Sequence, residues 1–305
     1  MANSYPERQQ RLPFTMWNKS PSVAIAKAYL KLAPAFPPRN WTAPKALERA
    51  RMEYDDEIAG GFLKWFPEVS LSGMSVFDIG SGYGGRSVRY RELGAHRVVG
   101  LEVFPRMVEE SRAFAEHKGL TNMEFHVGEG EHLPFADDTF DLVTSYDVFE
   151  HVHQLDKVLD ECMRVLKPRG RLLAIFPPFY HPGGSHLEGW VSKMPWPNLF
   201  FRRETLISAV QEIMRERNDG YEPHPMRPGD KLWTLNGATI RSVKATIRRR
   251  KFRRVRIELA PLFSTMNEKW ARWKMRYYAP LFRPLRHIPL LNELFVHRIV
   301  LDITK

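Results

Sequence analysis

Four glycines lie within six residues at the end of a short apolar run, in the segment Asp78-Ile79-Gly80-Ser81-Gly82-Tyr83-Gly84-Gly85. Because glycine lacks a Cβ, such a loop lets the backbone approach a ligand closely between a strand and a helix. The spacing of Gly80, Gly82 and Gly85 also fits G-x-G-x-x-G, the pattern of loops that bind a dinucleotide pyrophosphate. The loop therefore predicts a nucleotide-like cofactor and leaves the class of cofactor open.

Two carboxylates accompany this loop. Asp78 stands directly before it, where its charge suits an ammonium group of the ligand, although aspartate at a strand end also caps its own turn. Glu102 ends the next predicted strand, and a carboxylate at that position accepts hydrogen bonds from both ribose hydroxyls. Glu102 therefore favours a ligand that carries adenosine.

A second group of reactive side chains is Asp147, Glu150 and His151, whose spacing places them on one face if the segment is helical. Two carboxylates and an imidazole suit a hard cation such as Mg²⁺ or Mn²⁺. The alternative is a site without metal, in which Asp147 or a histidine handles the proton of the acceptor. His181 and His186, in a loop rich in glycine and proline, are the further candidates for general base.

The elements that must position these residues alternate along the chain. Strands are predicted at 76–79, 97–102, 123–127, 140–146 and 171–176, with helices at 86–93, 105–118 and 155–166 between them. This alternation predicts a doubly wound, mostly parallel α/β sheet, and strands at 252–259 and 298–304 would bring it to seven. The loops after the strands would then meet at the switch point where ligands bind.

The chain divides into four predicted segments. Residues 1–70 form an N-terminal arm with helices, and residues 71–177 form the cofactor-binding core. Residues 178–235 form a substrate lid or insertion, and residues 236–305 complete the sheet and add a helical extension. The lid carries Trp190, Trp196, Phe200 and Phe201, which line an acceptor pocket or form the lid's own small core.

Further motifs lie at 128–135, 138–143, 150–152 and 166–172. Their order and spacing over about residues 74–177 resemble the class I S-adenosylmethionine-dependent methyltransferases of the type 11 group. The resemblance implies a Rossmann-like fold, S-adenosyl-L-methionine as cofactor, Glu129 near the adenine amino group, and the Gly130 amide near the adenine ring. It also makes Leu-Lys-Pro-Arg-Gly the turn before the fifth strand. The expected cofactor contacts are Asp78, Gly80, Ser81, Gly82, Gly84, Glu102, Val103, Glu129, Gly130, Glu131 and Tyr146.

The acceptor is less defined. The Asp147, Glu150, His151 motif resembles the E-x-x-E-H of metal-assisted O-methyltransferases, with the shorter Asp147 in place of glutamate. We therefore expect O-methylation of a small-molecule hydroxyl on a saccharide, glycolipid or isoprenoid-type acceptor, with or without metal. The alternatives are an RNA methyltransferase, a C- or N-methyltransferase of a small molecule, and a protein that binds the cofactor without catalysis.

Charge and composition limit the partners. The 305 residues carry a net charge of +11, and nine of the sixteen residues from 241 to 256 are Lys or Arg. Such a segment attracts the phosphate of a lipid, an acceptor or nucleic acid, unless it is only a solvated helix face and edge strand. The single cysteine, Cys162, excludes an internal disulfide.

The location and assembly of the protein also follow from the sequence as expectations. The N-terminus lacks an apolar signal segment, and no apolar run reaches about 18 residues. We expect a cytoplasmic protein, with peripheral contact to a membrane as an open alternative. The aromatic tail at 262–295 offers a surface for a homodimer.

Overall fold

The computed structural model describes residues 21–34, 46–58, 61–187, 191–217, 235–262, 280, 284–289 and 291–305. The chain forms two compact units, one made of 1–39 and 182–234 and the other of 40–181 and 235–305. Residues 40–70, which we assigned to the N-terminal arm, thus group with the sheet. Trp190 and most of the aromatic tail lie outside the described residues.

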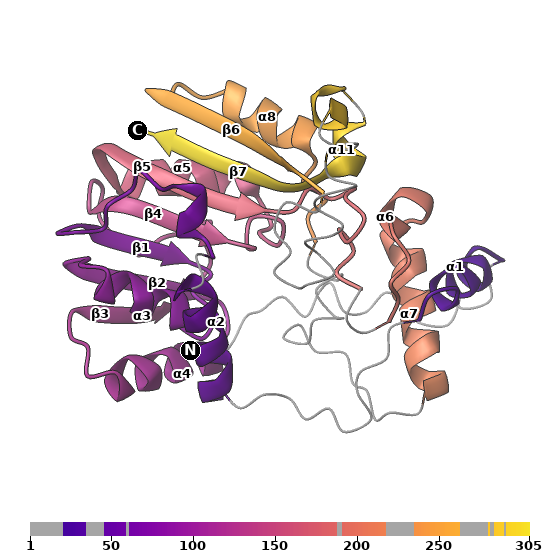
Figure 1. Ribbon diagram of the computed structural model, residues 1–305, viewed down its shortest axis with the longest axis horizontal. Helices are drawn as coiled ribbons and strands as arrows, with labels where there is room; N and C mark the ends of the chain where they lie inside the picture. The colour runs from indigo at the N-terminus through magenta and orange to yellow at the C-terminus, as the bar shows by residue number, and fades with distance from the viewer. Residues whose placement is uncertain are drawn as a thin grey trace. The chain divides into compact units, whose positions relative to one another are not determined.

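The larger unit is built on one seven-stranded sheet with the order β3-β2-β1-β4-β5-β7-β6 (Figure 1). β1 to β5 are parallel, and β7 runs antiparallel to both β5 and β6. The strands are β1 (Ser75–Ile79), β2 (Arg97–Glu102), β3 (Met123–Val127), β4 (Phe140–Tyr146), β5 (Leu166–Phe176), β6 (Arg254–Pro261) and β7 (Val296–Thr304). The prediction of a mostly parallel, doubly wound sheet is confirmed. The Leu-Lys-Pro-Arg-Gly motif lies inside β5, where the register with β4 shifts and Arg169 has a φ of 69°.

Helices cover both faces of this sheet. α5 (Leu155–Val165) and α8 (Ile240–Arg248) pack on one face, and α3 (Gly85–Glu92) and α4 (Pro105–His117) pack on the other (Figure 1). The remaining elements of this unit are α2 (Ala46–Ile58), α11 (Asn292–Phe295) and the short 3-10 helices η2 (Leu63–Trp65) and η4 (Pro284–His287). α5 shows why these segments are helical, since Val158, Cys162 and Val165 recur at helical spacing and are fully buried.

The strand order determines where a ligand site forms. From β1 the chain proceeds to β2 and β3 on one side and then returns to β4 on the other, so the order reverses at β1. In sheets of this type, ligands bind beyond the carboxyl ends of the strands at the point of reversal. Ile79, Glu102 and Tyr146 end β1, β2 and β4 there.

The smaller unit is helical. α1 (Pro21–Lys31) packs on α7 (Arg203–Arg217), and α6 (Pro197–Phe200) precedes α7. The ring of Tyr29 lies 5.6 Å from that of Phe200 and 5.4 Å from that of Phe201, measured between centroids. Two of the predicted pocket aromatics therefore contribute to the packing of their own unit, which was the alternative role.

No helix of the described residues has both the length and the apolar character that a membrane span requires.

Candidate active site

The glycine loop leaves β1 in a conformation that few other residues adopt. Gly80, Gly82 and Gly84 have φ angles of 70°, 58° and 78°, which is the left-handed region. At Gly80 a Cβ would also lie 2.1 Å from Val148 Cγ2. The amides of Gly80 and Ser81 both donate to the carbonyl of Leu101, at 2.8 and 3.0 Å, and so fasten the loop to β2.

Asp78 lies beneath this loop and is 2% exposed. Its two carboxylate oxygens accept hydrogen bonds from Ser87 Oγ at 2.6 Å and Thr144 Oγ1 at 3.0 Å. Burial raises the pKa of Asp78, and the charge of Arg86 opposes that rise. The side chain thus joins β1, β4 and α3, and its predicted contact with a cofactor ammonium group remains a prediction.

Glu102 ends β2 beside the loop and is 8% exposed. Its Oε2 accepts from the Gly82 amide at 3.1 Å, and its Oε1 accepts from the Val103 amide at 2.8 Å. These backbone donors hold the carboxylate in a defined position at the carboxyl edge of the sheet. That is the position from which a carboxylate binds ribose hydroxyls.

A second carboxylate at the loop, Glu53 of α2, was not predicted. Its oxygens accept from the amides of Tyr83 and Gly85, both at 3.1 Å, at the amino end of α3. Burial raises the pKa of Glu53 to about 7, although Arg86 and these amides favour the charged form. Glu53 is 25 residues before Asp78 in the sequence, and no motif connects it to the loop, so only the packing of α2 on α3 shows this contact.

The other predicted cofactor contacts have different surroundings. Gly130 is buried, and a Cβ there would lie 3.3 Å from Val158 Cγ2. Glu131 accepts from the Gln154 amide at 3.0 Å, so its carboxylate connects this loop to the start of α5. The Ser81 hydroxyl is buried, and it lies 2.7 Å from where a Cβ of Gly100 would be. Glu129 and Val103 are partly exposed.

An arginine that the sequence analysis missed lies beside the end of β4. The Arg86 guanidinium is 4.4 Å from the ring centre of Tyr146, and its Nε is 3.5 Å from Glu57 Oε2. Burial raises the pKa of Tyr146 to about 12, so the phenol keeps its proton at neutral pH. Arg86 directly follows the last glycine of the loop, and that position was the available signal.

The backbone at Asp147 does not have the helical conformation that the spacing predicted. The turn at 147–151 is not helical, and Asp147 has a φ of 57°. Its Oδ1 accepts a hydrogen bond from Nη1 of Arg298 in β7. Burial works against the charge of Arg298, but Asp147 and Tyr146 outweigh it and raise its pKa.

This ion pair removes Asp147 from the predicted set of metal ligands. In the part of the sheet-bearing unit that the structure describes, Asp147, Glu150 and His151 do not bring their ligand atoms together as one set. A guanidinium on the Asp147 carboxylate also repels a divalent cation. Asp147 therefore does not fit the three-ligand metal site that the spacing suggested, and the roles of Glu150 and His151 as ligands remain predictions.

The three histidines predicted as general bases have different surroundings. His151 Nε2 lies 3.7 Å from Oε1 of the buried Glu150. The ring of His181, which follows β5, lies 5.7 Å from that of His297 in β7. Burial lowers the pKa of His297 to about 4, so this histidine is neutral near pH 7. His186 belongs to the smaller unit.

Sequence comparisons agree with this architecture. Residues 77–174 match a family described as a methyltransferase domain. An uncharacterized methyltransferase of Bacillus subtilis, YcgJ, is 34% identical over 119 residues, which cover 39% of this chain and 46% of the relative. A demethylmenaquinone methyltransferase of Thermobifida fusca is 37% identical over 135 residues, which cover 42% of this chain and 55% of the relative. The chain thus spans about half the length of these curated relatives.

Comparison with solved structures supports the fold. Phosphoethanolamine N-methyltransferase 2 of Haemonchus contortus, in complex with phosphomonomethylethanolamine and S-adenosylhomocysteine, matches with a TM-score of 0.54. The sequence identity is 15%, and the match covers 83% of this chain and 52% of that chain. At this identity the similarity concerns the fold alone.

Proposed function

Residues 77–174 match a methyltransferase domain, and on that premise we propose that the chain is a class I S-adenosylmethionine-dependent methyltransferase of the type 11 group that methylates a hydroxyl of a small-molecule acceptor. The observation that carries this proposal is the carboxyl edge of the sheet. There the glycine loop, the Glu102 carboxylate and the turn after Tyr146 follow neighbouring strands. This is the location at which such sheets bind nucleotide-like ligands.

The residues present fit the cofactor. Gly80 and Gly82 have left-handed φ angles, and a Cβ would lie 2.1 Å from Val148 Cγ2 at the first and 2.6 Å from Glu53 Oε1 at the second. The backbone amides hold the Glu102 carboxylate where ribose hydroxyls would donate to it. When bound, S-adenosylmethionine would supply an activated methyl group on a sulfonium, whose thioether is the leaving group when the acceptor takes the methyl. The chain must then orient the acceptor and remove its proton.

We assign the proton transfer to His151. Its Nε2 lies 3.7 Å from the carboxylate of Glu150, on the turn that follows β4. A carboxylate at this distance stabilises the imidazolium that forms when His151 takes a proton. Glu150 is then a positioning residue, and the ion pair of Asp147 with Arg298 holds the start of the same turn.

N-methylation is the second candidate, because a norajmaline N-methyltransferase of Rauvolfia serpentina is 32% identical to this chain over 108 residues. An amine acceptor needs orientation more than a base.

The basic segment at 241–256 does not favour RNA over a small molecule as the acceptor. It lies on α8 and β6 at one edge of the sheet, away from the cofactor loop that follows β1.

Binding of S-adenosylmethionine measured by calorimetry is the first test, and a purified chain that binds none would overturn the proposal. The second test is turnover of labelled cofactor with a set of hydroxyl and amine acceptors. We expect His151→Ala to retain cofactor binding and to lose about 10²- to 10⁴-fold in turnover on a hydroxyl acceptor. Full activity of this variant on a hydroxyl would contradict the assignment of His151 as the base.

A further inference from the structure

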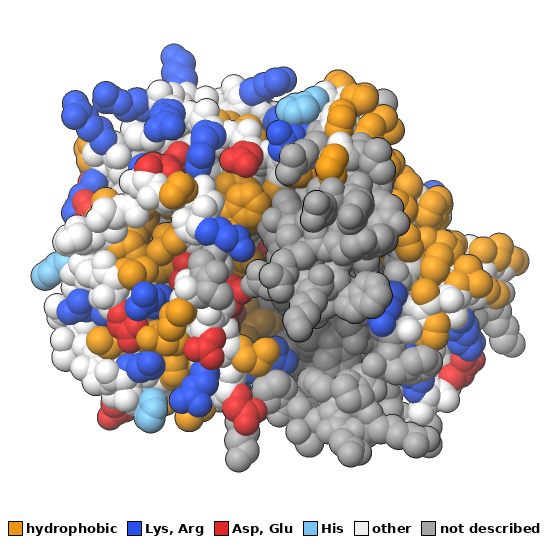
Figure 2. Space-filling view, in the orientation of Figure 1, with side chains coloured by type: hydrophobic (Ala, Val, Ile, Leu, Met, Phe, Trp, Pro, Cys, Tyr) orange, Lys and Arg blue, Asp and Glu red, His pale blue; other side chains and the backbone are white. Residues whose placement is uncertain are grey.

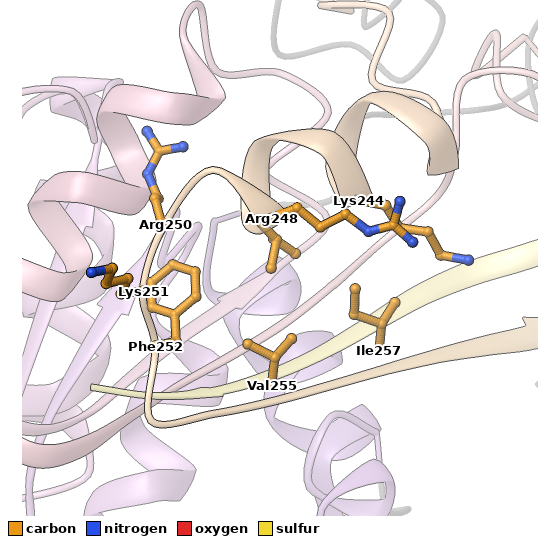
Figure 3. A pocket seen from close by; sticks show the side chains of 8 residues that line it. Lys244, Arg248, Arg250, Lys251, Phe252, Val255 and Ile257 are labelled. Carbon is orange, nitrogen blue, oxygen red and sulfur yellow. The ribbon is translucent and has the colours of Figure 1, made fainter.

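A pocket of about 430 Å³ opens between α8 and β6, in the unit that carries the sheet. Lys244 and Arg248 extend over it from α8, and Lys251 lies on the turn that leads to β6 (Figure 3). Phe252, Val255 and Ile257 form its apolar floor, below the helix in the same view. The pocket therefore has a basic rim and an apolar floor.

Three of the four basic side chains at the pocket form no ion pair with the acidic residues that the structure describes. Arg250, a fourth basic residue of the pocket, is committed to the structure, because its Nε donates to Asp160 Oδ1 at 2.6 Å. Among the described residues, no acidic group forms an ion pair with Lys244, Arg248 or Lys251. Figure 2 shows many Lys and Arg side chains along the edge of the sheet where Figure 1 draws β6 and α8.

The floor is apolar surface at the edge of the sheet. β6 is the last strand in the sheet order, and Val255 on it is 40% exposed. Phe252 and Ile257 are only partly buried against the core. Apolar groups beside unpaired cations suit a ligand that has both an anionic group and a hydrocarbon part.

The position of the pocket separates it from the cofactor loop. β6 is four strands from β1 in the sheet order, which corresponds to about 19 Å at the usual strand spacing. Val255 pairs with Ile303 of β7, which in turn pairs with Leu172 near the amino end of the parallel part of β5. A ligand in the pocket is therefore not the group that receives the methyl.

We propose that this pocket binds the phosphate headgroup of an anionic lipid and so attaches the protein to the surface of a membrane. The phosphate lies against Lys244, Arg248 and Lys251, and the first part of the hydrocarbon chain contacts Val255 and its apolar neighbours. Single-stranded RNA is less suited to this surface, because its bases need aromatic side chains for stacking and Phe252 is the one aromatic residue among the described residues of the lining.

Hydrogen bonds at the start of α8 hold the helix that carries two of the pocket's cations in place. Thr239 and Ser242 form a capping box at the start of the helix, and Glu293 accepts from the amides of Ile240 and Arg241, both at 2.8 Å. At the other end, Arg248 stands in the last turn, where the helix dipole favours positive charge. Lys244 and Arg248 are thus carried by a helix with both ends stabilised.

The test is sedimentation of the full chain with phosphatidylcholine vesicles, with and without phosphatidylglycerol. We expect binding to the anionic vesicles and little to the neutral ones. A variant with Lys244→Gln, Arg248→Gln and Lys251→Gln should bind on the order of 100-fold more weakly, because each cation near an anionic surface contributes about fivefold. The matched control, with Arg51→Gln, Lys64→Gln and Lys157→Gln, removes three exposed cations from other places and should bind as the wild type does.

The hydrocarbon contact needs its own variant. Val255→Ser leaves every charge in place, and we expect it to weaken vesicle binding severalfold. Equal losses in the two triple variants would show nonspecific attraction by net charge and overturn the proposal. The proposal would also be overturned if Val255→Ser bound the anionic vesicles as tightly as the wild type does. Two further outcomes would overturn it: inorganic phosphate that binds the protein as tightly as the vesicles do, or a single-stranded RNA that binds more tightly than the vesicles. Cofactor binding, measured in parallel, should be unchanged in all variants, so a failure here is distinct from a failure of the proposed function.

Discussion

Nη1 of Arg298 in β7 donates to Oδ1 of Asp147 on the turn after β4, which joins two segments 151 residues apart. The guanidinium also lies 5.7 Å from the ring centre of Tyr146. The last strand of the chain thereby fixes the turn that carries Glu150 and His151. The ion pair occupies the Asp147 carboxylate, which the spacing of these residues had suggested as a metal ligand.

The ion pair should be measurable as a coupling energy. Asp147→Asn suits the left-handed backbone of this position, which asparagine tolerates well, so the substitution removes mainly the charge. We expect each of Asp147→Asn and Arg298→Gln to lower the free energy of unfolding by about 2 kcal/mol, since each leaves a partly buried partner without its counter-charge. Urea unfolding of both variants and of the double variant gives the coupling. Additive effects would show that the two side chains do not interact.

Methyl transfer should not depend on a divalent cation. The Asp147 carboxylate is paired with Arg298, so the predicted ligand set is incomplete among the described residues of the sheet-bearing unit. We expect turnover to be the same with EDTA and with added Mg²⁺ or Mn²⁺. Loss of activity in EDTA that Mg²⁺ restores would show that the turn at 147–151 binds a metal in spite of the ion pair of Asp147.

Glu102→Ala should weaken the binding of S-adenosylmethionine by about 10- to 100-fold, the effect of losing hydrogen bonds to one charged group. Calorimetry measures the change. Glu124→Ala is a suitable control, because it removes a carboxylate from the neighbouring strand β3, where Glu124 pairs with Arg97 on the exposed surface. If both variants bind alike, the ribose contact assigned to Glu102 is wrong.

The stability of the protein should depend on pH through Glu53. Its pKa is about 7 in the folded chain against an ordinary value of 4.5, so between these values the folded state holds a proton that the unfolded state has released. This contribution to stability is complete below pH 4.5 and is lost as the pH rises through about 7. A shift of this size corresponds to about 3 kcal/mol.

The test compares the pH profile of thermal unfolding in the wild type and in Glu53→Gln. His297 acts in the opposite sense, because its pKa is lowered to about 4 and its contribution is lost as the pH falls from 6.5. The difference between the two profiles isolates Glu53, and it should change mainly between pH 4.5 and 7. Parallel profiles would mean that the carboxyl does not titrate in this range.

The sequence by itself determined the sheet and the place of the glycine loop and Glu102 at its carboxyl edge. Alternating strand and helix patterns predicted five parallel strands within a few residues of their bounds, because burial imposes those periodicities on the chain. The glycine loop and Glu102 were also predicted, since each lies directly at the end of a strand. The parallel order then brings those ends to one edge.

Only the tertiary structure decided the partners of the charged groups. Glu53 reaches the loop through the packing of α2 on α3, and Arg298 reaches Asp147 because β7 pairs antiparallel with β5. Neither contact follows a local repeat, so spacing along the chain carries no signal for it. The helix that would have aligned Asp147 with Glu150 does not form, because Asp147 takes a left-handed turn and pairs across the sheet.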